Sequence, residues 1–129
     1  MKTPQDVINA FYTLLPMEPK TGFDRWYKYS YPNGIDKQYF GVINTLGVPA
    51  DSIQTVEVNV NIYAKDLDTQ RNIPDLSALS DIASDVIAET HNYNNDLFDI
   101  EYTVGNIIRE PELNSHFFNL RFKLIFINN

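Results

Sequence analysis

The chain has 129 residues, with 10 lysines and arginines against 17 aspartates and glutamates and a formal net charge of −7. This length suits one domain, and 43% hydrophobic content supplies a core large enough to exclude overall disorder. The absence of cysteine excludes disulfides, thiolate metal sites and cysteine nucleophiles. The sequence pI near 4.6 argues against a free-standing nucleic-acid-binding protein, because no basic cluster is visible.

The sequence also lacks membrane and export signals. No apolar run approaches the roughly 18 residues of a membrane span. The N-terminal segment MKTPQDV has no apolar core of the kind found in signal peptides. We therefore expect a single domain over 1–129 that contacts no membrane and is not exported by the general secretory route.

The first predicted element is a helix from Thr3 to Leu15. Thr3 suits the N-cap, Pro4 the first helical position, and the Asp6 carboxylate favours a helix N-terminus. Pro16 ends the helix. One face is apolar and is formed by Val7, Ile8, Phe11, Leu14 and Leu15.

Three strands are predicted next. The aromatic segment Phe23 to Tyr31 precedes the turn signal Pro32-Asn33-Gly34, and a second segment runs from Gln38 to Leu46. The clearest strand is Thr55 to Lys65, in which apolar and polar residues alternate. Its apolar side is formed by Val56, Val58, Val60, Ile62 and Ala64, and its polar side by Glu57, Asn59, Asn61 and Tyr63.

A second helix and two more strands complete the chain. Pro74 and Asp75 introduce the helix. Its expected apolar stripe consists of Leu76, Leu79, Ile82, Ala83, Val86 and Ile87. A loop over 91–96 leads to strands at Leu97 to Ile108 and Phe117 to Ile127, whose apolar faces alternate. On their polar faces, Asp99 and Glu101 are expected opposite Arg121 or Lys123.

These elements predict an α+β fold: an antiparallel sheet of about four or five strands packed on two amphipathic helices, with the other face partly polar. Extended polar loops are expected near 16–36, 65–74 and 109–116. Such loops are long for so small a domain, and docking onto neighbouring subunits is one use for them.

Catalytic and metal sites find little support. His91 and His116 lack helix-spaced metal-binding partners, so both are expected to be exposed, and no metal site is predicted. Asp81 and Asp85 lie one helical turn apart on the polar face of the second helix and are interpreted as solubilising charges, and Asp66-Leu67-Asp68 lacks the Gly and terminal Glu of a calcium loop. The five glycines are scattered, so no phosphate-binding loop forms and no cofactor is expected.

The stretch Arg25 to Tyr31 interleaves aromatic residues with basic ones. Such a pattern can stack on single-stranded nucleic acid. Trp, Tyr and Arg are also enriched at protein–protein interfaces, and a core edge strand has a similar composition. In an acidic chain, an interface or the core is the favoured interpretation.

The strand TVEVNVNIYAK at Thr55–Lys65 resembles the small neck proteins of tailed bacteriophages, the tail terminator or tail-completion family. The resemblance extends to the order of elements over nearly the whole chain. It matches Val7 to Leu15, Tyr39 to Leu46, Leu76 to Glu89 and the hairpin Leu97 to Ile127. The region Thr21 to Asp36 departs most from the family.

The resemblance implies a structural virion protein without enzymatic activity. Such a protein forms a homo-oligomeric neck ring at the head–tail junction and links portal or connector proteins to the tail. DNA passes through the lumen without sequence-specific binding, and an acidic lumen would not retain its phosphates. The implied location is the virion neck or tail, with the host cytoplasm during assembly.

Under this hypothesis, heterologous contacts close the ring. The predicted contact residues are Arg25, Trp26, Tyr27, Tyr29, Tyr31, Asp66, Asp68 and Arg71. The alternative is a small ferredoxin-like module that binds a ligand or peptide, and a third hypothesis is an acid–base enzyme using His91 or His116. A groove on a monomer would favour the second, and a histidine bonded to an acid in a cleft the third.

Overall fold

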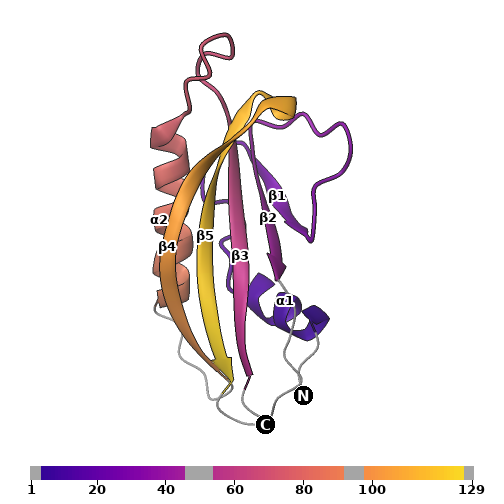
Figure 1. The fold of residues 1–129 in the computed structure, drawn as a ribbon, viewed down its shortest axis with the longest axis vertical. Helices are drawn as coiled ribbons and strands as arrows, with labels where there is room; N and C mark the ends of the chain where they lie inside the picture. The colour runs from indigo at the N-terminus through magenta and orange to yellow at the C-terminus, as the bar shows by residue number, and fades with distance from the viewer. Residues whose placement is uncertain (1–3, 46–53, 92–97, 127–129) are drawn as a thin grey trace.

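The computed structural model describes residues 4–45, 54–91 and 98–126. These residues form one sheet with both helices on the same side (Figure 1). In chain order the elements are α1 (Pro4–Tyr12), β1 (Phe23–Lys28), β2 (Tyr39–Thr45), β3 (Gln54–Lys65), α2 (Leu76–His91), β4 (Phe98–Glu110), the short 3-10 helix η1 (Pro111–Leu113) and β5 (Ser115–Phe126).

The sheet is mixed, so the expectation of an antiparallel sheet is wrong. The strand order is β1-β2-β3-β5-β4. The pairs β2–β3, β3–β5 and β5–β4 are antiparallel, whereas β1 pairs parallel with β2. The described part of the chain is mostly strand, because five strands stand beside the two α-helices.

The parallel pair arises from the connection 29–38. β1 ends at Lys28, where Tyr29 adopts a left-handed φ of 73°, so the predicted strand is three residues too long. The chain then returns along the sheet and starts β2 level with the start of β1, since Phe23 is the register partner of Tyr39. Ten residues reach easily across a six-residue strand. A connection of this length lets β2 pair parallel with β1, whereas a two-residue hairpin would make the pair antiparallel.

The core lies between the helices and one face of the sheet, called here the helix face. The alternation predicted for β3 is confirmed: Val56, Val58, Val60, Ile62 and Ala64 are all buried. Leu120, Phe122 and Leu124 of β5 occupy the same face, and Phe11 of α1 packs on Phe122 with ring centroids 5.1 Å apart. Neither α1 nor α2 lies over the opposite face, called here the open face (Figure 1).

Both helices differ in detail from their predicted bounds. Helix α1 ends at Tyr12 rather than Leu15, and the proposed Thr3 cap lies outside the described residues. Helix α2 is capped by Asp75, whose carboxylate accepts a 3.1 Å hydrogen bond from the Ala78 backbone N–H. Leu76 is 52% exposed and does not belong to the buried stripe.

The expected polar loop at 109–116 is largely absent. β4 continues to Glu110, and β5 starts at Ser115 after a single 3-10 turn. Asn114 takes the left-handed conformation that closes this turn, with φ of 51°. The hairpin is therefore tight, and Arg109 pairs in register with His116 inside the sheet.

Trp26 fixes the position of β1 against the rest of the domain. Its indole N–H donates a 2.6 Å hydrogen bond to the carbonyl of Pro16, and its ring is buried against Phe23. Its register partner is Gly41, where an added Cβ would lie 2.1 Å from the Trp26 ring. Only a glycine therefore lets the indole lie flat over β2.

We predict that Gly41→Ala lowers the free energy of unfolding by about 1–3 kcal/mol, because the methyl group overpacks the site. Denaturant unfolding measures this loss. The matched control is Gly41→Ala in a Trp26→Phe background, where the smaller ring should reduce the cost of the alanine. Equal costs in both backgrounds would contradict the proposed packing.

Candidate functional site

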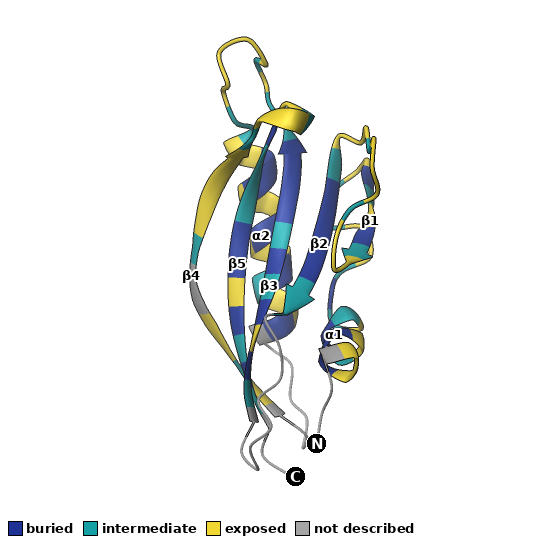
Figure 2. Ribbon diagram, turned by 45° about the vertical axis from the view of Figure 1, so that its right-hand side comes forward, coloured by how far each residue is buried: buried dark blue, intermediate teal, exposed yellow. Residues whose placement is uncertain are grey.

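The two strands at the edges of the sheet are β1 and β4. Each has a neighbour on one side only. An unpaired strand edge presents a row of N–H and C=O groups to which another strand can bond. Figure 2 shows the two strands on opposite sides of the sheet, with β4 largely exposed along its length.

The β1 edge is cationic. Arg25 and Lys28 are exposed, and neither forms an ion pair within the described part of the chain. The Arg25 guanidinium lies 5.8 Å from the centroid of the Tyr27 ring. Lys28 Nζ lies 4.7 Å from the centroid of the Tyr12 ring and donates to Asn9 Oδ1 at 2.9 Å. Both charges thus remain available to a partner.

A hollow of about 530 Å³ runs beside this edge and is called here the β1 hollow. It is lined by five consecutive residues of β1, Asp24 to Lys28, together with Tyr12 and Met17. Met17 is 79% exposed, which makes it the most exposed large apolar side chain among the described residues. The hollow therefore combines an unpaired strand, apolar surface and positive charge.

The β4 edge has a different chemistry. It exposes Tyr102, Ile107 and Ile108, which are 46%, 39% and 44% accessible. Its charged side chains are Asp99, Glu101, Arg109 and Glu110, so acidic residues predominate. This surface was not predicted from the sequence. The sequence signal for this surface is the pair of consecutive isoleucines shortly after Gly105, where the alternation of apolar and polar residues breaks.

A β-bulge explains the break. The register shifts between Thr103 and Asn106, so Ile107 faces the helix side beside Phe118 while Ile108 faces the open side beside Phe117. Gly105 lies so close to β5 that an added Cβ would be 2.1 Å from the Asn119 carbonyl oxygen.

The aromatic stretch predicted as one contact surface is divided among four places. Trp26 is 4% exposed and belongs to the core. Tyr29 is exposed and donates a 2.7 Å hydrogen bond to Gln5. Tyr27 and Tyr31 are half-buried on the open face, and Arg25 alone lies free at the edge.

An aromatic cluster occupies one end of the open face. Phe40 stacks on Tyr63 with a centroid separation of 4.6 Å, and Tyr31 packs edge-on against both rings. Burial raises the pKa of Tyr63 well above the ordinary tyrosine value, and the charges of Tyr31 and Glu110 act in the same direction.

A second hollow of about 420 Å³ adjoins this cluster, and its lining includes Tyr31, Ile35 and Leu113. Lys65 and Asp36 form an ion pair on its wall, and the ammonium holds the pKa of the Asp36 carboxyl below its usual range. Part of the wall of this hollow is thus formed by two charged groups that already pair with each other.

The middle of the open face is a row of asparagines. Asn119 of β5 donates to Asn61 Oδ1 at 2.6 Å, and Asn59 of β3 donates to Asn44 Oδ1 at 3.2 Å. Arg121 donates to Asn119 Oδ1 at 3.1 Å. These amides satisfy one another, which leaves a polar surface that is close to neutral.

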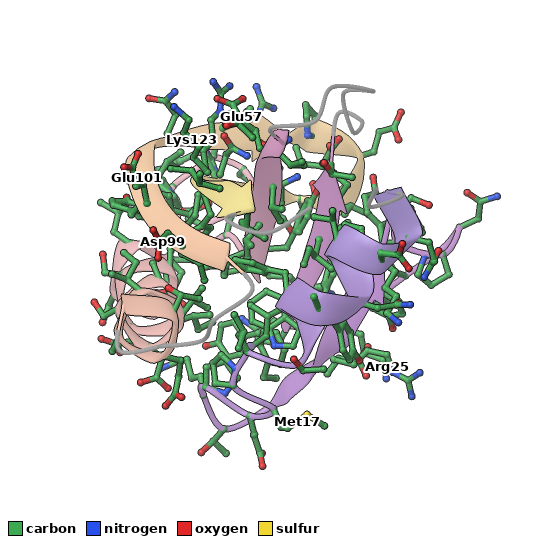
Figure 3. All side chains as sticks on the ribbon, turned by 90° about the horizontal axis from the view of Figure 1, so that it is seen from below. Met17, Arg25, Glu57, Asp99, Glu101 and Lys123 are labelled. Carbon is green, nitrogen blue, oxygen red and sulfur yellow. The ribbon has the colours of Figure 1, made fainter. Side chains whose placement is uncertain are left out.

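Charged residues follow the asparagine row along the open face. Lys123 of β5 is the register partner of both Glu57 and Glu101. The pairing of Glu101 with Lys123 confirms one expected contact, whereas Asp99 lies opposite Ile125 and Arg121 opposite Thr103. Glu57, Lys123 and Glu101 lie along one side of the sheet in Figure 3, and Met17 lies on the other.

The loop residues predicted as contacts are mostly engaged within the chain. Asp66 is 2% exposed in its side chain, and its Oδ1 lies 2.6 Å from Nδ1 of His116. Asp68 accepts backbone hydrogen bonds from Gln70 and Arg71, which shapes the loop. Arg71 is exposed at its tip. Asp66 is therefore an internal anchor, and the expected exposure of His116 is wrong.

The pairing of His116 with Asp66 resembles part of a catalytic dyad, but neither residue lines either hollow. The side chain of His91 lies outside the described part of the structure. Asp81 forms an ion pair with Lys20 at 3.6 Å. Within the described residues, no group of three acidic or histidine side chains could hold a metal ion.

Comparison with known proteins adds no assignment: the chain matches no protein-family model and no curated protein. Among the described residues, no helix is both long and apolar enough to cross a membrane.

We predict that Asp66→Ala lowers the free energy of unfolding by about 1–3 kcal/mol, because it leaves the half-buried His116 ring without its partner. Asp85→Ala, at an exposed position on α2, should change it by no more than about 0.5 kcal/mol. Thermal or denaturant unfolding measures both. A stable Asp66→Ala variant that had lost self-association would instead identify Asp66 as a contact residue.

Proposed function

We propose that this protein is a structural subunit of a tailed-bacteriophage virion that forms a ring at the head–tail junction. The ring links portal or connector proteins to the tail and lets DNA pass through its lumen. The observation that carries the proposal is the presence of two free strand edges, β1 and β4, on opposite sides of one sheet.

Chemical difference between these edges favours a ring over a symmetric dimer. A two-fold contact brings the same patch together from both copies, whereas a head-to-tail contact joins two different patches and closes into a ring. On β1 the cations Arg25 and Lys28 outnumber the one carboxylate, Asp24, and on β4 acidic residues outnumber the one cation, Arg109, so two like edges would bring a net like charge together. Unlike edges attract, so a head-to-tail arrangement is preferred.

The order of elements supports the phage assignment. A short helix, a strand pair, the long strand Thr55–Lys65, a second helix and a terminal hairpin follow one another as in the neck proteins that the sequence resembles. The net charge of −7 would keep the inner wall from retaining DNA phosphates. Such a subunit would work in the virion neck and assemble in the host cytoplasm.

The β1 hollow favours one alternative, a peptide-binding module. An extended peptide can add to an exposed strand, with side chains filling adjacent hollows. The ferredoxin-like architecture expected for such a module is wrong, since that fold has the order β-α-β-β-α-β and this chain begins with a helix followed by three strands. This alternative requires a monomer that binds peptide with one-to-one stoichiometry.

Light scattering on the purified protein should give a mass several times 14.9 kDa, and electron microscopy should show rings with a central opening. Mixing with portal and tail proteins should place these rings between the two. A particle of 14.9 kDa at every concentration that also fails to join those partners would contradict the proposed function.

A further inference from the structure

We propose that β4 of one copy pairs antiparallel with β1 of the next copy, with Ile107 packed in the β1 hollow. This inference rests on the proposed ring and identifies the surfaces that close it. The occupant of the β1 hollow is thus a second copy of this chain, through its exposed edge strand.

Strand direction sets the antiparallel sense. β1 and β2 run in the same direction, and three successive antiparallel pairings lead from β2 to β4. β4 therefore runs opposite to β1 within one copy. Copies placed side by side around an axis that follows the strands keep this relation, so β4 meets the next β1 antiparallel.

Register brings the right residues to the same height. One row crosses the whole sheet through Trp26, Gly41, Ile62, Phe118 and Ile107. If rows continue from copy to copy, Ile107 lies level with the next Trp26, in the middle of the hollow-lining segment. The six residues of β1 then lie alongside the half of β4 that carries both exposed isoleucines.

The faces agree as well. Ile107 lies on the helix face beside Phe118, and Tyr12 at the hollow also packs on the helix-side core. Ile108 lies on the open face beside Phe117, as does Tyr27 of β1. A side-by-side arrangement keeps the same face outward in every copy, so both isoleucines meet apolar surface.

Charges favour this partner over a second copy of the same edge. In this register Asp24 of β1 lies opposite Arg109 of β4, with Glu110 at the next position of the same segment. Opposite charges on neighbouring strands stabilise pairing, whereas like charges oppose it. The competing occupants are a second β4, an insertion of the 66–75 loop, and a foreign peptide.

Disulfide trapping tests the pairing, because the natural chain has no cysteine. The variant Met17→Cys/Ile107→Cys should form a ladder of covalent oligomers under mild oxidation. A bond within one copy is excluded, since four strand spacings of about 4.8 Å separate the edges and a disulfide spans less than about 7 Å between Cα atoms. Each single variant should stay uncrosslinked.

Two cross-linking results would overturn the pairing. Dimers of Ile107→Cys alone would show that β4 pairs with β4. A ladder from Met17→Cys/Leu67→Cys, without one from the isoleucine variant, would show that the 66–75 loop fills the hollow.

A charge placed in the contact gives an independent test. Ile107→Asp should raise the concentration needed for half-assembly by at least about tenfold, because a carboxylate would be buried against apolar surface. The matched control Leu67→Asp changes a residue that is 70% exposed at the loop and should leave assembly unchanged. Circular dichroism should show both variants folded.

The outcomes separate this inference from the function on which it rests. A wild-type protein that forms rings while Ile107→Asp assembles normally would reject the edge pairing alone. A wild-type protein that never assembles would reject the ring as well. Assembly lost in Leu67→Asp but kept in Ile107→Asp would also reject the edge pairing.

Discussion

The antiparallel pairing of β3 with β5 is the contact on which the rest of the structure depends. It extends over all twelve residues of each strand, from Gln54 opposite Phe126 to Lys65 opposite Ser115. Because side chains alternate along a strand, this register places every valine of β3 on the helix face and every asparagine on the open face. A slip of one residue would exchange the core for the polar row.

The central pair also determines where the edges lie. β2 adds to one side of it and β4 to the other, and the Trp26 indole over Gly41 then holds β1 as the outer strand. The 29–38 connection folds onto the open face through Tyr31 and Ile35. It thus covers part of that face, and β1 remains the outer strand of the sheet.

Strands with regular alternation could be predicted from sequence, and the relation between strands could not. The valine pattern of β3 shows its buried face directly, and the glutamate–lysine pair of Glu101 and Lys123 follows from antiparallel alternation. The parallel sense of β1 depends on a loop whose path is set by tertiary packing on Phe40 and Tyr63. Local signals therefore suggested a simpler antiparallel sheet.

The candidate contact residues show the same limit. The aromatic stretch suggested Trp26, and the polar loop suggested Asp66, as interface residues. In the structure the Trp26 ring packs over Gly41, and the Asp66 carboxylate lies against the His116 ring. Both contacts join residues far apart in the sequence. The exposed isoleucines of β4 could have been noticed, since two adjacent apolar residues cannot both face one side of a strand.

Hydrogen exchange measured as a function of protein concentration tests the central claim most directly. Assembly through the two edges should slow exchange of backbone amides in β1 and in the 104–110 half of β4 together, because both sets of N–H groups become bonded between copies. Protection confined to the 66–75 loop, or gained by only one of the two strands, would contradict the account.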